Sequence, residues 1–373
     1  MKLTKFFALM LAAATFAVGC DGGDTPDVPE ATGAITLEVA NASIELGEDI
    51  VFTVMQEGKD VTAAATIYKA YDDYAEVSNP FTPTATGSFS FFATKGKESS
   101  KTVTVTVMAS VPVLPEDSDP SNTKFNHRIL MIDHTGVNCG NCPRVMDGLK
   151  ALAETDAHNS YNEVCVHGGG FAPSGSDKAY SDAARVVDQF YGPRGYPNIC
   201  FNFYGGQGDI GGVQTFVATN SAIIKSLVKA DGADAGVAVA ASGDKSAVYV
   251  SLAVKAAVEQ EYKVTAWLLE NQIYNPAQVG ASSDKDYHKI HDFALRNIAG
   301  EYSRADLSGD SLGVIAAGEV KEHSFELPII SNKWVVENMD VLIIVSAMDD
   351  MGRFEVVNTV SCPVNGTVNY EYL

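Results

Sequence analysis

Basic residues are scarce in this sequence of 373 residues. It contains 26 Lys and Arg against 47 Asp and Glu. Nucleic acids and anionic lipid surfaces attract positively charged proteins, so this excess of negative charge argues against both as partners. After residue 19, no run is long and apolar enough to cross a bilayer. We therefore expect no nucleic-acid partner and no membrane-spanning segment in the mature chain.

Cysteine is also sparse, and only one pair has the C-x-x-C spacing. That pair is Cys139 and Cys142, and no second C-x-x-C completes the ligand set of a structural zinc site. Three further cysteines, Cys165, Cys200 and Cys362, fall within apolar runs, and we interpret them as small buried residues. No cofactor motif is present, so no cofactor is predicted.

The N-terminus reads MKLTKFFALMLAAATFAVGC. A positive start and the apolar run 6–18 are typical of a secretory signal over residues 1–19. Ala17-Val18-Gly19-Cys20 resembles the bacterial lipobox, so we expect a lipidated Cys20 followed by an acidic tether over 20–33. An ordinary cleaved signal is the alternative. Cleavage removes two lysines and leaves 24 basic against 47 acidic residues, a net charge of about −23.

The mature length predicts a multidomain α+β protein. Residues 34–110 read as short alternating strands separated by glycines, the pattern of an immunoglobulin-like β-sandwich. Residues 111–126 contain three prolines and several acids and are predicted to be a linker. We find no catalytic constellation in either segment.

Residues 127–232 switch to alternating strands and helices. RILMIDHT, NEVCVHGGG and NICFNFYGG read as buried strands, with helical periodicity between them, so one α/β domain with a largely parallel sheet is predicted. From residue 233 to residue 373, apolar and polar residues again alternate with a period of two, as in residues 34–110. A C-terminal β-sandwich is expected there, interrupted by a polar insertion over 275–312.

The cysteine pair stands where a buried strand ends and a helix begins. A thiolate there is stabilised by the helix N-terminus, which lowers its pKa. Cys139, as the first and more exposed residue, is predicted to attack, and Cys142 to resolve the mixed disulfide. Asp133 lies six residues before Cys139, and a loop ending in Tyr196-Pro197 precedes the next strand.

In these features the domain resembles the thioredoxin fold. The resemblance implies that Asp133 accepts the proton of Cys142, and that Pro197 follows a cis bond and packs beside the cysteines. Two features depart from the pattern. Asn138 replaces the usual Trp, and a Gly-rich and Ser-rich insertion, HGGGFAPSGSDKAYSDAAR, lies between the pair and Pro197.

Residues 127 to about 365 resemble a Bacteroidetes lipoprotein family named after a twenty-eight-kilodalton outer-membrane protein. The most specific stretches are HRILMIDHTGVNCGNCP and YGPRGYPNICFN. The resemblance implies residence at the outer membrane, lipid-anchored on its periplasmic or cell-surface face.

The pair admits three interpretations. It is a redox pair, a static disulfide, or a metal site in which His134 and His167 join two thiolates around zinc or copper(I). His288 and His291 are expected in a polar loop or helix without a site role. Two functions remain open: thiol–disulfide exchange on exported or surface proteins, and a non-catalytic surface interaction protein with a structural disulfide.

Overall fold

The computed structural model describes residues 35–71, 74–84, 86–108 and 111–373. The predicted signal, the tether and Cys20 lie outside the described residues. The chain divides into two compact units, of which the second contains 106–373 together with the short segments 43–49 and 82–88. The remainder of the described chain belongs to the first unit. Each unit is described by itself.

The N-terminal strands are short and alternate buried with exposed side chains. Their bounds are β1 Ile35–Val39, β2 Ser43–Glu45, β3 Phe52–Gln56, β4 Lys59–Asp60, β5 Thr66–Lys69, β6 Glu76–Val77, β7 Gly87–Lys95, β8 Glu98–Ser99 and β9 Val103–Met108, with a 3-10 turn at Thr62–Ala64. One sheet has the order β1–β3–β4, and β5 pairs antiparallel with β6 and β7. Phe52 and Phe91 meet edge to face, with ring centroids 4.9 Å apart. Immunoglobulin-like topology stays a prediction.

The second unit holds the helices and longer strands. The helices are α1 Cys142–Leu152, α2 Asp182–Tyr191 and α3 Val213–Leu227, with 3-10 turns at Asp156–Ser160, Asp286–Lys289 and Val336–Asn338. The strands are β10 Ile129–His134, β11 Tyr161–Val166, β12 Asn198–Phe201, β13 Ala235–Gly243, β14 Ala247–Ala256, β15 Gln260–Glu270, β16 Ile273–Tyr274, β17 Ile290–His291, β18 Ala294–Ala299, β19 Asp310–Ile315, β20 Val320–Pro328, β21 Met339–Met348, β22 Phe354–Pro363 and β23 Gly366–Val368.

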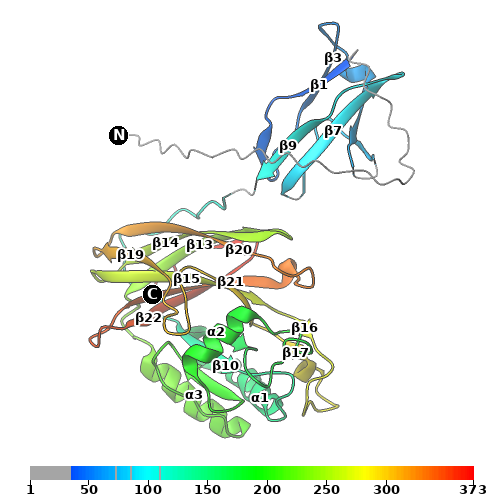
Figure 1. Ribbon diagram of the computed structural model, residues 1–373. Helices are drawn as coiled ribbons and strands as arrows, with labels where there is room; N and C mark the ends of the chain where they lie inside the picture. The colour runs from blue at the N-terminus through cyan, green and yellow to red at the C-terminus, as the bar shows by residue number, and fades with distance from the viewer. Residues whose placement is uncertain (1–34, 72–73, 85, 109–110) are drawn as a thin grey trace. The chain divides into compact units, whose positions relative to one another are not determined.

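Two sheets organise this unit. An eight-stranded sheet has the order β12–β10–β11–β18–β15–β21–β22, with β19 also on β15, and a four-stranded sheet has the order β20–β14–β13–β23. Their inward side chains form one apolar core, because strands with a period of two each supply one apolar face. The helices lie at the end of the unit away from the four-stranded sheet (Figure 1).

The C-x-x-C segment belongs to the part of the large sheet that carries helices on both faces. Met131 of β10 packs with Val145 and Leu149 of α1, whereas Ile132 packs with Val187 of α2. Burial of both faces explains why ILMIDH contains a continuous apolar run. The helix α2 begins at the cap of Ser181, whose hydroxyl accepts from Ala184 N, and ends at Gly192 with φ 57°.

The sheet around β10 is mixed rather than largely parallel. Strand β11 runs parallel to β10, but β12 runs antiparallel to it. The sequence does not reveal this reversal, because the strands are similar apolar runs whichever way they point. Strand β11 also joins β18, where Cys165 is the partner of Ala294. Consequently residues 127–232 and the strands that follow share one sheet and one compact unit.

The segment predicted to be a linker contacts the four-stranded sheet. Lys255 of β14 is buried, and its Nζ donates to Asp117 Oδ2 at 3.0 Å and to the Pro120 carbonyl at 2.8 Å. Phe125 is 1% exposed and stacks on Tyr372. These contacts hold this proline-rich segment against the unit.

Candidate functional site

Cys139 and Cys142 form a disulfide at the start of α1. Their Cα atoms are 5.4 Å apart. The helix begins at Cys142 with Asn141 as its cap residue, so Cys139 stands in the turn before the helix rather than at its first position. The turn is closed by Cys142 N donating to the Cys139 carbonyl at 3.3 Å. The sequence placed the pair correctly at a strand-to-helix junction.

The expectation of an exposed Cys139 is wrong, because both cysteines are buried. Cys139 is 2% exposed and Cys142 is 1% exposed. The C-x-x-C turn does reach solvent, but through Asn138, Gly140 and Asn141. The physical reason is that two segments distant in sequence pack over the turn and shield the cysteines.

The first of these segments, residues 275–289, is the covering loop. It connects β16 to β17, and its ends are held together by Asn275 N donating to the Lys289 carbonyl at 2.7 Å. Val279 N donates to the Val137 carbonyl at 2.8 Å, and Gln278 Nε2 donates to the Cys139 carbonyl at 3.2 Å. The predicted polar insertion therefore lies directly on the cysteine turn.

A polar cluster on α1 fastens the far end of the covering loop. Asp147 accepts hydrogen bonds from Lys285 Nζ at 2.8 Å, from the Tyr287 hydroxyl, and from His288 Nε2 at 2.8 Å. Burial raises the pKa of Asp147, but these hydrogen bonds outweigh it and bring the pKa to about 2. His288 Nδ1 in turn accepts from Ser282 N, so this histidine of the covering loop is buried and links the loop to α1.

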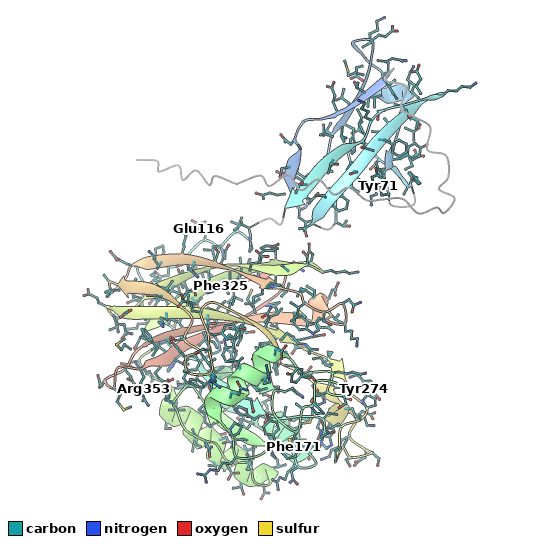
Figure 2. The ribbon with its side chains drawn as sticks, in the orientation of Figure 1. Tyr71, Glu116, Phe171, Tyr274, Phe325 and Arg353 are labelled. Atoms are coloured by element: carbon teal, nitrogen blue, oxygen red, sulfur yellow. A yellow bond between two sulfur atoms is a disulfide. The ribbon has the colours of Figure 1, made fainter. Side chains whose placement is uncertain are left out.

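The second segment belongs to the insertion between β11 and α2. Asn138 N donates to the Phe171 carbonyl at 2.9 Å, and Val137 N donates to Asp177 Oδ2 at 2.8 Å. The same oxygen of Asp177 accepts from His167 Nδ1 at 2.9 Å. Phe171 itself is 44% exposed, and Figure 2 places it at the helical end of the unit. The insertion thus fixes the residues just before Cys139.

Asp133 is buried as predicted. Its side chain is on the same face of β10 as Met131, which packs against α1, and it is 2% exposed. Burial, with the nearby charge of Glu163 adding to it, raises the pKa of Asp133 well above its usual value. Its Oδ1 has no hydrogen-bond partner within the described part of the chain. The role of this carboxyl in proton transfer stays a prediction.

The Tyr196–Pro197 bond is cis, which confirms the prediction for the loop before β12. A network missed by the sequence holds this loop. Asp188 Oδ1 on α2 accepts from the Tyr196 hydroxyl at 2.5 Å and from His134 Nδ1 at 3.0 Å. The residue before Pro197 is therefore tied to the end of β10. Proximity of Pro197 to the sulfurs stays a prediction.

The histidines of the proposed metal site are engaged separately. His134 points toward α2 and bonds Asp188, whereas His167 bonds Asp177 beside the cysteine turn. His167 and His291 meet edge to face, with ring centroids 4.8 Å apart, so His291 is also buried rather than in a polar loop. No group of three or more potential metal ligands gathers among the residues that the structure describes.

The remaining cysteines of the second unit are free and buried, as predicted. Cys165 of β11 and Cys200 of β12 flank β10 on opposite sides. Burial raises the pKa of Cys200 to about 12 and that of Cys362 to about 11, and it raises the pKa of Cys165 well above the usual value. These thiols stay protonated at neutral pH and are poor nucleophiles.

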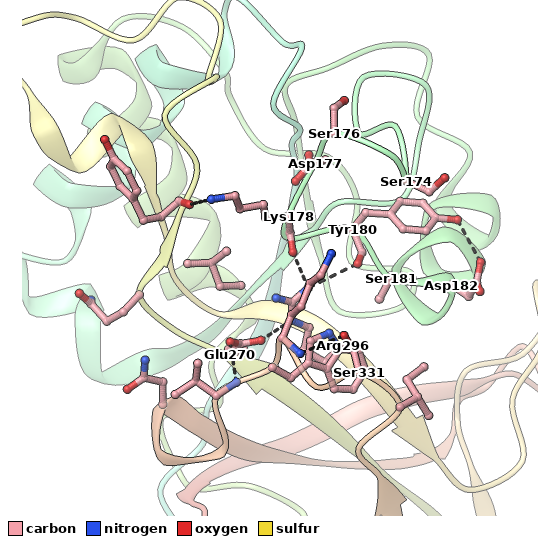
Figure 3. A pocket seen from close by; sticks show the side chains of 18 of the residues that line it. Ser174, Ser176, Asp177, Lys178, Tyr180, Ser181, Asp182, Glu270, Arg296 and Ser331 are labelled. Carbon is pink, nitrogen blue, oxygen red and sulfur yellow. Dashed lines mark hydrogen bonds and ion pairs between the residues drawn. The ribbon is translucent and has the colours of Figure 1, made fainter. Parts of the chain in front are cut away.

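A cavity of about 630 Å³ lies between the insertion that precedes α2, the strands β15 and β18, and residues 330–338. Figure 3 shows an ion pair in its wall, in which Arg296 Nε donates to Glu270 Oε2 at 2.6 Å. Arg296 Nη1 also donates to the Lys178 carbonyl, and Val335 N donates to Glu270 Oε1. Both side chains are 3% exposed. This pair ties the insertion to the large sheet.

Sequence reasoning missed three residues that enclose the pair, namely Asp147, Asp177 and Gln278. Each lies in a segment read as polar loop or helix surface, and each acts across a long sequence separation. The concentration of charge and aromatic residues in DKDYHKIHDF was the one available signal, because a solvated loop does not require it.

The sequence matches no protein-family model and no curated protein. Among solved structures, HBP35 of Porphyromonas gingivalis is similar at 18% identity and a TM-score of 0.49, over 65% of this chain and 77% of that chain. Domains 4–9 of the surface layer protein SbsC align at 10% identity and a TM-score of 0.16, over 88% of this chain and 50% of that one. In the described residues, no helix is long and apolar enough to cross a membrane.

Proposed function

We propose that this protein is a lipid-anchored envelope protein whose Cys139–Cys142 pair exchanges disulfides with exported or surface proteins. The observation that carries the proposal is the disulfide at the start of α1, on the helix-facing side of a strand that also presents the buried carboxyl of Asp133. Burial raises the pKa of this carboxyl, and in its protonated form it is suited to deliver a proton to a departing thiolate. We assign the domain around the pair to the thioredoxin-like class on these grounds.

The reaction begins with a substrate thiolate attacking Cys139 Sγ. The Cys139–Cys142 bond breaks, and Cys142 leaves as a thiolate that takes a proton from Asp133. A second substrate thiol then displaces Cys139, so the substrate dithiol is oxidised and the pair is reduced by two electrons. Because both cysteines are shielded, the covering loop must move before a protein thiol reaches Cys139.

A redox titration tests the exchange function. The protein is equilibrated in dithiothreitol and glutathione buffers and quenched with a thiol-alkylating reagent. Mass spectrometry then gives the fraction of protein in which the Cys139–Cys142 pair is reduced. A working exchanger has a potential above roughly −300 mV, whereas a structural disulfide lies below it. A value well below that limit, with no transfer to a reduced test protein, contradicts the proposal.

The second candidate function is that of a non-catalytic surface interaction protein in which the Cys139–Cys142 bond is a structural disulfide. The observation in its favour is the enclosure of both cysteines, since a static disulfide needs no access. The same titration separates the two functions. The stability of a Cys139→Ser, Cys142→Ser double variant is measured alongside. A loss of about 2–5 kcal/mol relative to wild type is expected if the disulfide is structural.

The anchor forms a separate part of the proposal. Ala17-Val18-Gly19-Cys20 supports lipidation at Cys20, and we place the protein at the outer membrane as a member of the Bacteroidetes lipoprotein family described above. Detergent partitioning of a Cys20→Ala form tests the anchor. Membrane association that persists unchanged in that form contradicts it.

A further inference from the structure

A cavity of about 260 Å³ lies between α1 and the large sheet. Asp133 of β10, Glu163 and Cys165 of β11, and Lys150 of α1 line it together with residues 290–293. A water molecule takes up roughly 30 Å³ in the liquid, so the cavity can hold several. It offers space for water beside an otherwise buried carboxyl, that of Asp133.

The strand register explains why two carboxyl groups meet in this cavity. Met131 is the partner of Glu163, and Asp133 is the partner of Cys165. Partners on adjacent strands point to the same face of a sheet, and Met131 faces α1. Glu163 therefore lies on the helix side, one strand and two residues away from Asp133.

The two carboxyl groups differ in their access to water. Asp133 is 2% exposed, while Glu163 is only partly buried. Glu163 also lines a second cavity of about 410 Å³, together with residues 158–159, 161–162 and 360–361. Ala153 and Phe293 are the other residues common to both linings, so among the described residues Glu163 is the ionisable group at the junction.

The electrostatic setting suits proton transfer. Burial raises the pKa of Glu163 to about 7, the Cys165 thiol lowers it by donating at 3.5 Å, and the charge of Asp292 raises it. A group with this pKa takes and releases protons readily at neutral pH. The other titratable or charged groups around it are Asp133, Lys150, Tyr161, Cys165, Tyr287, His291 and Asp292 from this cavity and its surroundings, and Arg128, His158 and Glu371 from the second cavity.

We propose that Glu163 relays protons between Asp133 and solvent through the water-accessible cavity beneath α1. The inference rests on the proposed exchange function. When Asp133 has given its proton to the Cys142 thiolate, its carboxylate recovers a proton from Glu163 through intervening water, and Glu163 is reprotonated from solvent. Oxidation of the pair runs the same transfers in reverse. Glu163 acts through Asp133, and its hydrogen-bond partner is the Cys165 thiol rather than either sulfur of the Cys139–Cys142 pair, so it is a positioning residue.

Reduction of the intact oxidised protein by dithiothreitol, measured by quenched alkylation between about pH 5.5 and 8.5, tests the relay. After correction for ionisation of the reductant, the wild-type rate should follow a group with a pKa of about 7. Glu163→Gln should remove that dependence and slow reduction about tenfold below pH 7, whereas Glu163→Asp should restore it. Glu154→Gln, an exposed site just after α1, is the matched control and should behave as wild type.

The double variant Asp133→Asn, Glu163→Gln separates relay from structure. If Glu163 acts through Asp133, the Glu163→Gln change has no further effect on the rate in the Asp133→Asn background. An equal slowing in both backgrounds, or an unaltered pH profile in Glu163→Gln, overturns the relay.

A measurement that does not depend on disulfide exchange tests the coupling of Glu163 to Asp133 separately from the proposed exchange function. Carbon-13 NMR of labelled carboxyl groups in the oxidised protein should show the pKa of Asp133 falling in Glu163→Gln, because a neighbouring negative charge is lost. An unchanged titration of Asp133 overturns the coupling. Failure of the redox titration with a shifted Asp133 titration would instead refute the exchange function and retain the linked carboxyl pair.

Discussion

Gly280 of the covering loop lies against the Gly140 carbonyl inside the C-x-x-C turn, where an added Cβ would stand 2.2 Å from that oxygen. Gly280 also has φ +76°, a conformation that favours glycine. Gly280→Ala should therefore push the covering loop off the cysteine turn. Weakening the closed form by about 1.4 kcal/mol raises the open population about tenfold, and the reduction rate with a bulky phosphine reductant should rise accordingly.

Gly352→Ala is the matched control for that experiment. Gly352 has φ +74° and no atom within 4 Å of its added Cβ, so it carries the backbone strain without the clash. Both variants should lose about 1–2 kcal/mol of stability in urea unfolding, but only Gly280→Ala should accelerate reduction. Equal reduction rates in the two variants would show that the covering loop does not limit access.

Asp147→Asn should loosen the covering loop from the α1 side. The neutral amide cannot hold Lys285, and it loses the charge-assisted bonds from Tyr287 and His288. We expect faster backbone hydrogen exchange over 275–289, measured by mass spectrometry. Asp156→Asn, at an exposed turn, serves as the control. Unchanged exchange in Asp147→Asn would contradict the anchoring role.

The same carboxyl predicts a pH dependence of stability. The folded pKa of Asp147, about 2, lies below its unfolded value of about 3.9, so its contribution is present above pH 4 and is lost as pH falls toward 2. Subtracting the urea unfolding curve of Asp147→Asn from wild type between pH 2 and 6 isolates this contribution. A difference that does not shrink as pH falls would contradict the assignment.

Arg296→Met should destabilise the second unit strongly. It leaves Glu270, 3% exposed, without its charge partner and removes the bond that holds the Lys178 carbonyl. Breaking a buried pair in this way costs about 3–5 kcal/mol. Arg185→Met, at an exposed ion pair with Asp182, should change stability by about 0–1 kcal/mol. Urea unfolding measures both, and similar losses would refute a structural role specific to Arg296.

Lys255→Met tests the contact of the proline-rich segment. Without the ammonium group, Asp117 and the Pro120 carbonyl lose their shared donor, and the segment should become more accessible to proteases. Limited proteolysis followed by mass spectrometry should locate new cleavage near residues 114–120. Lys245→Met, at an exposed turn, is the control. An identical cleavage pattern in wild type and Lys255→Met would contradict this role.

Local patterns in the sequence were sufficient for much of the helix-bearing region. The apolar run of β10 and the periodicity of α1 and α2 follow from residues close together in the chain. The burial of Asp133 follows in the same way, because a carboxyl within a run of ILMI cannot reach solvent when both faces of the strand are covered. These predictions rest on hydrophobic period and local backbone chemistry.

Only the tertiary structure decided whether the cysteine pair is exposed or buried. Hydrogen bonds from Gln278 and Val279 reach the C-x-x-C turn from about 140 residues away, and they bury a cysteine that local reasoning placed at the surface. The antiparallel direction of β12 and the pairing of β11 with β18 are likewise set by sheet assembly. The sequence by itself determined which residues are apolar, which strands they form and where the cysteine pair stands. What covers that disulfide, and which carboxyl groups line the cavity beneath α1, depended on contacts between distant segments, because packing and strand register are properties of the assembled chain.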